Sequence, residues 1–196
     1  MPPQKRIFKQ DILDAAVRLV REKGPQSISV RNLAKEMNCS TQPIYSVFDN
    51  METLTDELIA FVRENYLCID ASNYKQFALS FLCFAKNEKN LFRLIYLRHR
   101  EENETLFEDP NQAKTVRKLC ASLELSQQSA EQMHRRMHYY CYSMAVMIAT
   151  GYLDFNEEEI NEELTEYYCI ILSYYKQVKS DEELQHWLKR SRNLML

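Results

Sequence analysis

Apolar residues near the start of the chain recur at steps of three and four residues, which is the spacing of one face of an α-helix. The residues of this stripe are Phe8, Ile12, Ala15, Ala16, Leu19 and Val20. The stripe predicts a first helix over residues 8–23. Gly24 can adopt the left-handed conformation that ends a helix, and Pro25 prevents its continuation.

Two shorter helices are predicted next, separated by a tight turn. Ser29 is a suitable N-cap for the second helix, and Ser40 is the predicted N-cap of the third, with Pro43 in its first turn. The apolar positions of this tract are Val30, Leu33, Ala34, Met37, Ile44 and Phe48. Asn50 is the predicted N-cap of a fourth helix that ends near residue 67.

The rest of the chain continues with helical periodicity. Helices are predicted near residues 73–86, 89–102, 111–124, 127–150, 157–178 and 181–193. Only Gly24 and Gly151 are glycines, fewer than a protein with several tight hairpins normally needs. We therefore predict an all-α fold: an N-terminal three-helix head with a helix-turn-helix over 1–66, and a C-terminal bundle of five to six helices over 67–196.

The charge of the chain is unevenly distributed. The first 50 residues contain eight Lys and Arg against five Asp and Glu, whereas the remainder contains 17 against 23. A basic head on an acidic body is typical of a protein whose N-terminal part binds nucleic acid. No segment resembles a signal peptide or a membrane span, so we expect a cytoplasmic protein without a membrane partner.

Enzymatic motifs are missing from the sequence. It has no glycine-rich phosphate loop, no nucleophile elbow and no HExxH motif, so we predict no enzyme and no cofactor. The six cysteines form no CxxC pair and lie within apolar helical patterns, as free thiols in a reducing compartment would.

The tract 29–48 has the organisation of a DNA-reading helix pair, in which the second helix enters the major groove. Gln42 could form two hydrogen bonds with adenine, and Thr41 could offer a hydroxyl or a methyl group to a base. Tyr45, Ser29 and Arg31 are better suited to phosphates. On this pattern alone, however, a short helix pair is more often ordinary helix packing.

The order of the residues resembles the TetR family of transcriptional regulators over residues 7–66. The matching positions are Ala15, Ala16, Gly24, Val30, Arg31, Leu33, Ala34, Ser40, Ile44, Tyr45, Phe48 and Leu54. The resemblance implies a three-helix DNA-binding head and a helical body that dimerises and holds a ligand cavity. Because bodies diverge widely in this family, it implies little about individual residues in 67–196.

The sequence also departs from the family pattern in the head. Asn38 stands where the turn usually has glycine, and Asn tolerates left-handed geometry. Met51 replaces a lysine that often contacts phosphate, and Lys5 and Arg6 could compensate as a basic arm. The candidate DNA-contacting residues are Lys5, Arg6, Ser29, Arg31, Thr41, Gln42, Pro43, Tyr45 and Ser46.

Two helices of the body have heptad spacing, which predicts an antiparallel pair. Apolar residues also lie off the two stripes, so the pair needs further neighbours: either a second copy of the chain in a four-helix interface, or other helices of the same chain. For the first alternative the candidate interface residues are Met133, Met144, Met147, Leu164, Ile171 and Tyr174.

Aromatic and methionine side chains of the body indicate an adaptable pocket for an unknown apolar small molecule. The candidate pocket residues are Phe81, Phe84, Tyr96, Met137, Tyr140 and Met144. His134, His138 and Cys141 share a helix face that could bind zinc, but a fourth ligand is missing, and polar interface histidines are the alternative. We predict no metal.

Together these patterns predict a DNA-binding transcriptional regulator. The expected mode is a repressor that binds double-stranded operator DNA as a homodimer and is released by a ligand. The alternative is a helical dimeric interaction or sensor protein with a weakened DNA-binding head.

Overall fold

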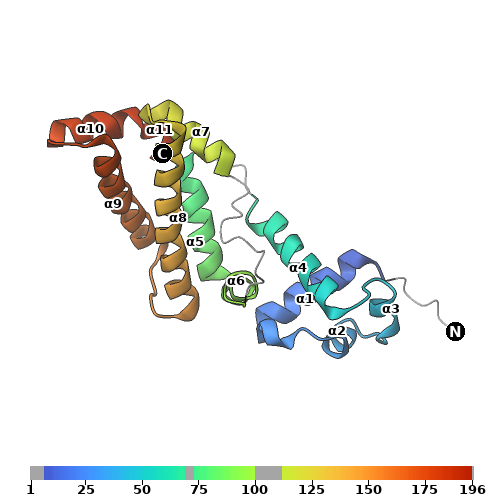
Figure 1. Cartoon of the computed structure of the whole chain (residues 1–196). Helices are drawn as coiled ribbons and strands as arrows, with labels where there is room; N and C mark the ends of the chain where they lie inside the picture. The colour runs from blue at the N-terminus through green and yellow to red at the C-terminus, as the bar shows by residue number, and fades with distance from the viewer. Residues whose placement is uncertain (1–6, 69–72, 100–111, 196) are drawn as a thin grey trace. The chain divides into compact units, whose positions relative to one another are not determined.

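The computed structural model describes residues 7–68, 73–99 and 112–195, and these form helices without any strand. The first part comprises α1 (Lys9–Lys23), the 3-10 helix η1 (Pro25–Ser27), α2 (Val30–Glu36), α3 (Gln42–Tyr45) and α4 (Met51–Tyr66). The elements that follow are α5 (Tyr74–Asn87), α6 (Lys89–Tyr96), α7 (Gln112–Leu123), α8 (Gln127–Thr150), α9 (Glu157–Lys176), α10 (Asp181–Arg190) and α11 (Arg192–Met195) (Figure 1).

The described residues form two compact units. The first contains the chain up to Leu67 together with Glu88–His99, and the second contains Cys68–Asn87 and the described part of the chain from Gln112 onward. Helix α6 therefore packs with the N-terminal helices, although a division into 1–66 and 67–196 assigns it to the C-terminal part. An amphipathic pattern shows that a helix has a buried face but does not identify the helix it packs against.

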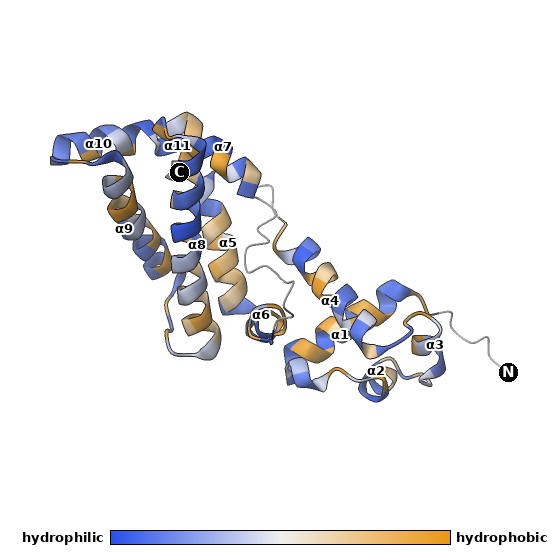
Figure 2. Ribbon diagram, viewed as in Figure 1, coloured by the Kyte–Doolittle hydropathy of each residue, from blue (hydrophilic) through white to orange (hydrophobic). Residues whose placement is uncertain are grey.

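Helix α1 is the centre of the first unit, where it contacts α2, α4, α6 and η1. Its apolar stripe is confirmed as the buried face from Ile12 to Val20, and Ile12, Ala15, Ala16 and Val20 have no exposed surface. Phe8, which was predicted in the same stripe, precedes the helix as its N-cap and is 56% exposed. Figure 2 shows the hydrophobic side of α1. The partners that complete this core are Leu33, Leu54, Leu58, Val62, Leu91, Phe92 and Ile95.

The second unit is built around α8, which contacts α5, α7 and α9. Helices α8 and α9 run antiparallel, as the heptad spacing predicts (Figure 1). One core cluster joins α5, α7, α8, α9 and α11. It consists of Tyr74, Val116, Leu119, Leu123, Ala130, Met133, Met137, Tyr168, Ile171, Leu172 and Leu194.

Several predicted helix ends differ from those of the structure. The helix predicted over 89–102 ends at Tyr96, and the one predicted over 157–178 ends at Lys176 because Gln177 is left-handed, with φ of 51°. The helix predicted over 181–193 is divided at Ser191 into α10 and α11. The prediction over 127–150 coincides with α8, which Gly151 ends with φ of 82°. No helix within the described ranges is both long and apolar enough to cross a bilayer.

Candidate nucleic-acid interface

A short chain of hydrogen bonds fixes the start of α2. The Ser29 hydroxyl accepts from the backbone N–H of Asn32 at 3.2 Å, which confirms Ser29 as the N-cap. The Asn32 amide donates to the Ser27 carbonyl at 2.8 Å, and the Ser27 hydroxyl donates to the Gly24 carbonyl at 2.6 Å. The Asn32 bond ties α2 to η1, and the Ser27 hydroxyl also reaches the Leu19 carbonyl of α1 at 3.2 Å, so α2 is held in a defined orientation at the end of α1.

The turn between α2 and α3 depends on Asn38, whose φ is 51°. Asn is among the few residues that adopt this left-handed conformation at low cost. The predicted N-cap at Ser40 is wrong: α3 begins after Thr41, and no side chain caps it. The reason is Pro43, because it lacks one of the backbone N–H groups that a Ser40 cap would need to accept from.

Helix α3 is anchored by one face and presents the other. Ile44 and Phe48 are 1% and 3% exposed, so they fix the helix in the head core. Thr41, Gln42 and Tyr45 are exposed, with 58% of Tyr45 accessible. We call these three side chains the reading face. They are the candidates predicted for base and phosphate contacts, and the fold brings them together.

The remaining candidates on α3 are less available for DNA. The Ser46 hydroxyl donates to the Pro43 carbonyl at 2.7 Å, so its hydrogen-bonding capacity is partly used within the helix, and Pro43 is half-buried. Arg31 and Ser29 lie at the start of α2, where Arg31 is exposed and Ser29 is half-buried. Lys5 and Arg6 lie outside the described residues.

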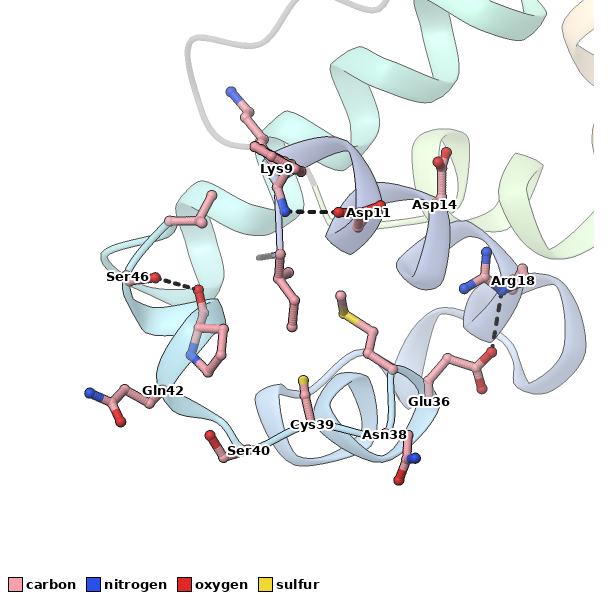
Figure 3. A pocket seen from close by; sticks show the side chains of 15 residues that line it. Lys9, Asp11, Asp14, Arg18, Glu36, Asn38, Cys39, Ser40, Gln42 and Ser46 are labelled. Atoms are coloured by element: carbon pink, nitrogen blue, oxygen red, sulfur yellow. Dashed lines mark hydrogen bonds and ion pairs between the residues drawn. The ribbon is translucent and has the colours of Figure 1, made fainter. Parts of the chain in front are cut away.

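A groove runs between α1 and the tract that includes the turn and α3 (Figure 3). Its charged groups already have partners. The Asp11 carboxylate accepts from the backbone N–H of Phe8 at 2.8 Å, Asp14 accepts from the Gln10 amide at 3.1 Å, and Arg18 lies 3.3 Å from Glu36. Among the described residues that line this groove, both cations, Lys9 and Arg18, are paired with carboxylates, so phosphates are more favourably bound on the side of Arg31 and Tyr45.

Several cations of the head are bound to carboxylates. Besides Arg18, Lys9 lies 2.6 Å from Glu57 and Arg21 lies 2.6 Å from Glu88. Arg31 forms no ion pair within the described part of the chain. Lys35, on the same helix, is likewise exposed and without an ion pair there, so Arg31 and Lys35 are the cations of α2 available to contact phosphate.

The candidate pocket residues do not all belong to one unit. Tyr96 lies on α6 in the first unit, where its ring is 4.8 Å from that of Phe92. The other five lie on α5 and α8, which pack together. Among these, Tyr140 turns toward α9: its hydroxyl donates to Glu163 at 2.7 Å, and its ring stacks on Tyr167 at 3.9 Å.

The candidate interface residues are mostly buried within a single chain. Met133, Met144, Leu164 and Ile171 are at most 4% exposed. In the single chain these four side chains are already covered by other helices, as the internal alternative expects. Of the six, Tyr174 is 63% exposed and Met147 is half-buried.

The outer surface of α8 and α9 contains apolar residues that the stripes did not include. Ile170 is 59% exposed and lies one turn before Tyr174 on α9. The guanidinium of Arg136, on α8, is 4.9 Å from the centre of the Tyr174 ring. The sequence indicated this surface through apolar residues that lie off the predicted stripe. A helix that is apolar on more than one face needs a neighbour on each of those faces.

The histidines of α8 are engaged with aromatic neighbours. His134 is buried, with Nδ1 3.5 Å from the Tyr74 hydroxyl, and the His138 ring is 6.2 Å from that of Phe81. Burial raises the pKa of Cys141 to about 12, which disfavours the thiolate that zinc binds. Within the described ranges, no group of three or more His, Cys, Asp or Glu side chains is arranged to hold a metal ion.

Comparisons with known proteins agree with this geometry. Residues 12–58 match the model of the bacterial regulatory proteins of the tetR family, and no curated protein matches the chain. Among solved structures, the chain is similar to a TetR variant from Acinetobacter baumannii AYE in complex with minocycline, with a TM-score of 0.60 and 19% identity over 89% of this chain and 99% of that chain. That likeness shows the fold, and the match over α1 to α4 identifies the head. Residues 12–58 therefore have the head of the bacterial regulatory proteins of the tetR family, and this match identifies the chain as a DNA-binding transcriptional regulator.

Proposed function

We propose that this regulator is a repressor that binds double-stranded operator DNA as a homodimer and is released by an apolar small molecule. The observation that carries the proposal is the reading face: Thr41, Gln42 and Tyr45 are exposed on a short helix that Ile44 and Phe48 anchor in the head. A rigidly held helix of this kind can enter a major groove and read base edges.

Dimerisation is supported by the outer surface of α8 and α9. Ile170 and Tyr174 are both more than half exposed, and Met147 is partly accessible. Ile170 and Tyr174 lie one turn apart on α9, and neighbouring exposed apolar side chains are typical of a surface that packs against another chain. We assign this surface to a second copy, because two copies would read two half-sites of one operator.

Release by a ligand is supported by the chemistry of the second unit. Phe84, Met137 and Met144 are buried where α5 and α8 pack. The fully buried Thr115 hydroxyl has no hydrogen-bond partner in the described part of the chain. An unpaired buried hydroxyl is unfavourable, and a ligand oxygen could pair with it. The solved relative, with a similar fold, was crystallised with minocycline.

Selection from a pool of random duplex DNA tests the DNA-binding mode. The purified chain should enrich a sequence with two related half-sites whose centres are about 34–36 Å apart. Binding should weaken with salt, because phosphate contacts release counterions. Enrichment of a single half-site, or of no sequence, would contradict the proposal.

The alternative of a sensor with a weakened head rests on the limited positive charge of the head. Met51 begins α4 in place of a basic residue, and Lys9, Arg18 and Arg21 are paired with carboxylates. The two functions differ in the slope of affinity against salt. Arg31→Ala removes one phosphate contact from each head, so a dimeric repressor should lose about two units of that slope, whereas a weakened head should show almost no slope to lose.

A further inference from the structure

Arg21, near the end of α1, binds two residues that are far from it in sequence. Its Nε donates to Oε2 of Glu88 at 2.8 Å, and its Nη2 donates to Oε1 of Glu88 at 2.6 Å. The same Nη2 donates to the Tyr66 hydroxyl at 2.5 Å, and the guanidinium carbon lies 5.3 Å from the centre of the Tyr66 ring. We call this group the Arg21 clamp. It joins the ends of α1, α4 and α6 within the first unit.

The two partners stand at two of the three points where the chain passes between the units, and the third point follows His99. The first unit ends at Leu67, one residue after Tyr66, and it resumes at Glu88. Any force that the second unit exerts through these two connections is therefore transmitted through Tyr66 or Glu88, or a residue next to it, and Arg21 binds both. Because this follows from the order of the chain, it does not depend on how the two units are arranged.

The contacts of the clamp are those of a rigid attachment. A two-pronged bond between guanidinium and carboxylate fixes orientation as well as distance. Glu88 occupies the N-cap position of α6 but makes no side-chain cap there, and its side chain is only 21% exposed. The bond to Glu88 raises the pKa of Arg21. In addition, the Asn90 amide donates to the Arg21 carbonyl at 2.9 Å, so α6 is tied to α1 twice.

We infer that Arg21, held by Glu88 and Tyr66, is a positioning residue that fixes the attachment of the DNA-reading head and thereby sets the half-site spacing the dimer accepts. This inference rests on the proposed function, since only a dimer on two half-sites is sensitive to spacing. A one-base-pair insertion moves a half-site by about 3.4 Å and rotates it around the helix axis. A dimer with rigidly attached heads binds such a site weakly, whereas a loosely attached head can move with the displaced half-site and keep its contacts.

The test uses the full chain and the duplex that the wild type selects from a random pool. Affinities are measured for that duplex and for versions with one base pair added or removed between the half-sites. Glu88→Gln, Arg21→Lys and Tyr66→Phe should each reduce the preference for the correct spacing, by three-fold or more for the first two. The bases preferred within each half-site should stay the same, because the reading face is unchanged.

Glu57→Gln is the matched control, because Glu57 also joins α4 to α1, through Lys9, but away from the two connections. It should retain the spacing preference of the wild type. Wild-type preference in all three clamp variants, each shown to be folded by circular dichroism, would overturn the inference. Loss of preference in the control as well would also overturn it. Failure of the wild type to select any duplex would instead contradict the proposed function.

Discussion

At the scale of single residues, Tyr45 shows how a side chain can position the protein without reading sequence. Its ring is 58% exposed on α3, whose buried face holds Ile44. Tyr45→Phe removes only the hydroxyl, so binding to all duplexes should weaken by a similar factor, worth roughly 1.5–3 kcal/mol for a lost bond to a charged phosphate. Titration of several selected sequences measures this. A change in the preferred bases would show that Tyr45 reads a base.

Gln42 should behave in the opposite way. Its amide is exposed at the start of α3 and can form two hydrogen bonds with adenine. Gln42→Ala should cost roughly 1–3 kcal/mol at one base pair of each half-site and little at the others. A panel of duplexes with single substitutions gives the cost at each position. A uniform loss over the panel would assign Gln42 to the backbone instead.

Cysteine reactivity should separate buried from exposed thiols. Burial raises the pKa of Cys141 to about 12, so almost no thiolate forms at pH 8, and reactivity should increase only as the pH approaches that value. Cys68 is exposed. Iodoacetamide at pH 8 should therefore alkylate Cys68 in the folded protein and Cys141 only after unfolding. Mass spectrometry of peptides from both states distinguishes the two sites, and early labelling of Cys141 would show that its helix opens.

Single residues could be predicted from the sequence where the cause is local. Ser29 and Asn50 cap the helices that follow them, because a cap involves residues only two or three positions apart. Ser40 was predicted by the same rule, and there Pro43 removes a donor that the rule requires. The contact between Arg21 and Glu88 joins residues 67 positions apart, and no local pattern indicates it.

At the scale of elements, periodicity predicted which segments are helical and where the long ones lie. Helix α8 coincides with its prediction because Ser126 and Gly151 mark its two ends. Periodicity does not predict which helices pack together, as α6 shows. Its apolar face was predictable, but its packing against α1 depends on the complete fold. For the same reason the heptad pattern on α8 and α9 leaves open whether a second copy or the same chain covers it, and the single chain itself buries Met133 and Leu164.

The conformation of the turn between α2 and α3 predicts how substitutions of Asn38 change the stability of the head. Asn38 is left-handed, and a side chain that tolerates this conformation less well strains the turn. Asn38→Ala should lower the free energy of unfolding by about 1 kcal/mol, whereas Asn38→Gly should stay close to the wild type. Urea titration followed by circular dichroism measures both. Equal losses in the two variants would show that the Asn side chain matters through its contacts and not through its backbone conformation.

At the scale of the whole molecule, the two units have different determinants. The head combines local caps with a core around α1, and its pattern over residues 12–58 is specific enough to match one family. The family match does not extend to the second unit, and the likeness of the chain to a solved structure, at 19% identity over 89% of its length, shows the fold alone. A DNA-reading head must meet a fixed duplex geometry, whereas a helical body needs only complementary apolar faces. The sequence therefore carries a more specific pattern in the head than in the body, and the contacts proposed for the reading face remain predictions.

The assembly of two copies can be tested on the outer surface of α9. Ile170 is 59% exposed there, so a charge should be tolerated in a single chain but should disrupt an interface that covers it. Ile170→Glu should leave the helical content unchanged, convert a dimer at micromolar concentration into a monomer in sedimentation velocity, and abolish preference for paired half-sites. The matched control is Gln185→Glu, which adds a charge at an exposed position of α10. A dimer that persists in Ile170→Glu would place the interface on another surface. A wild type that sediments as a monomer would remove the basis for two-site binding, because one head alone contacts only half of such an operator.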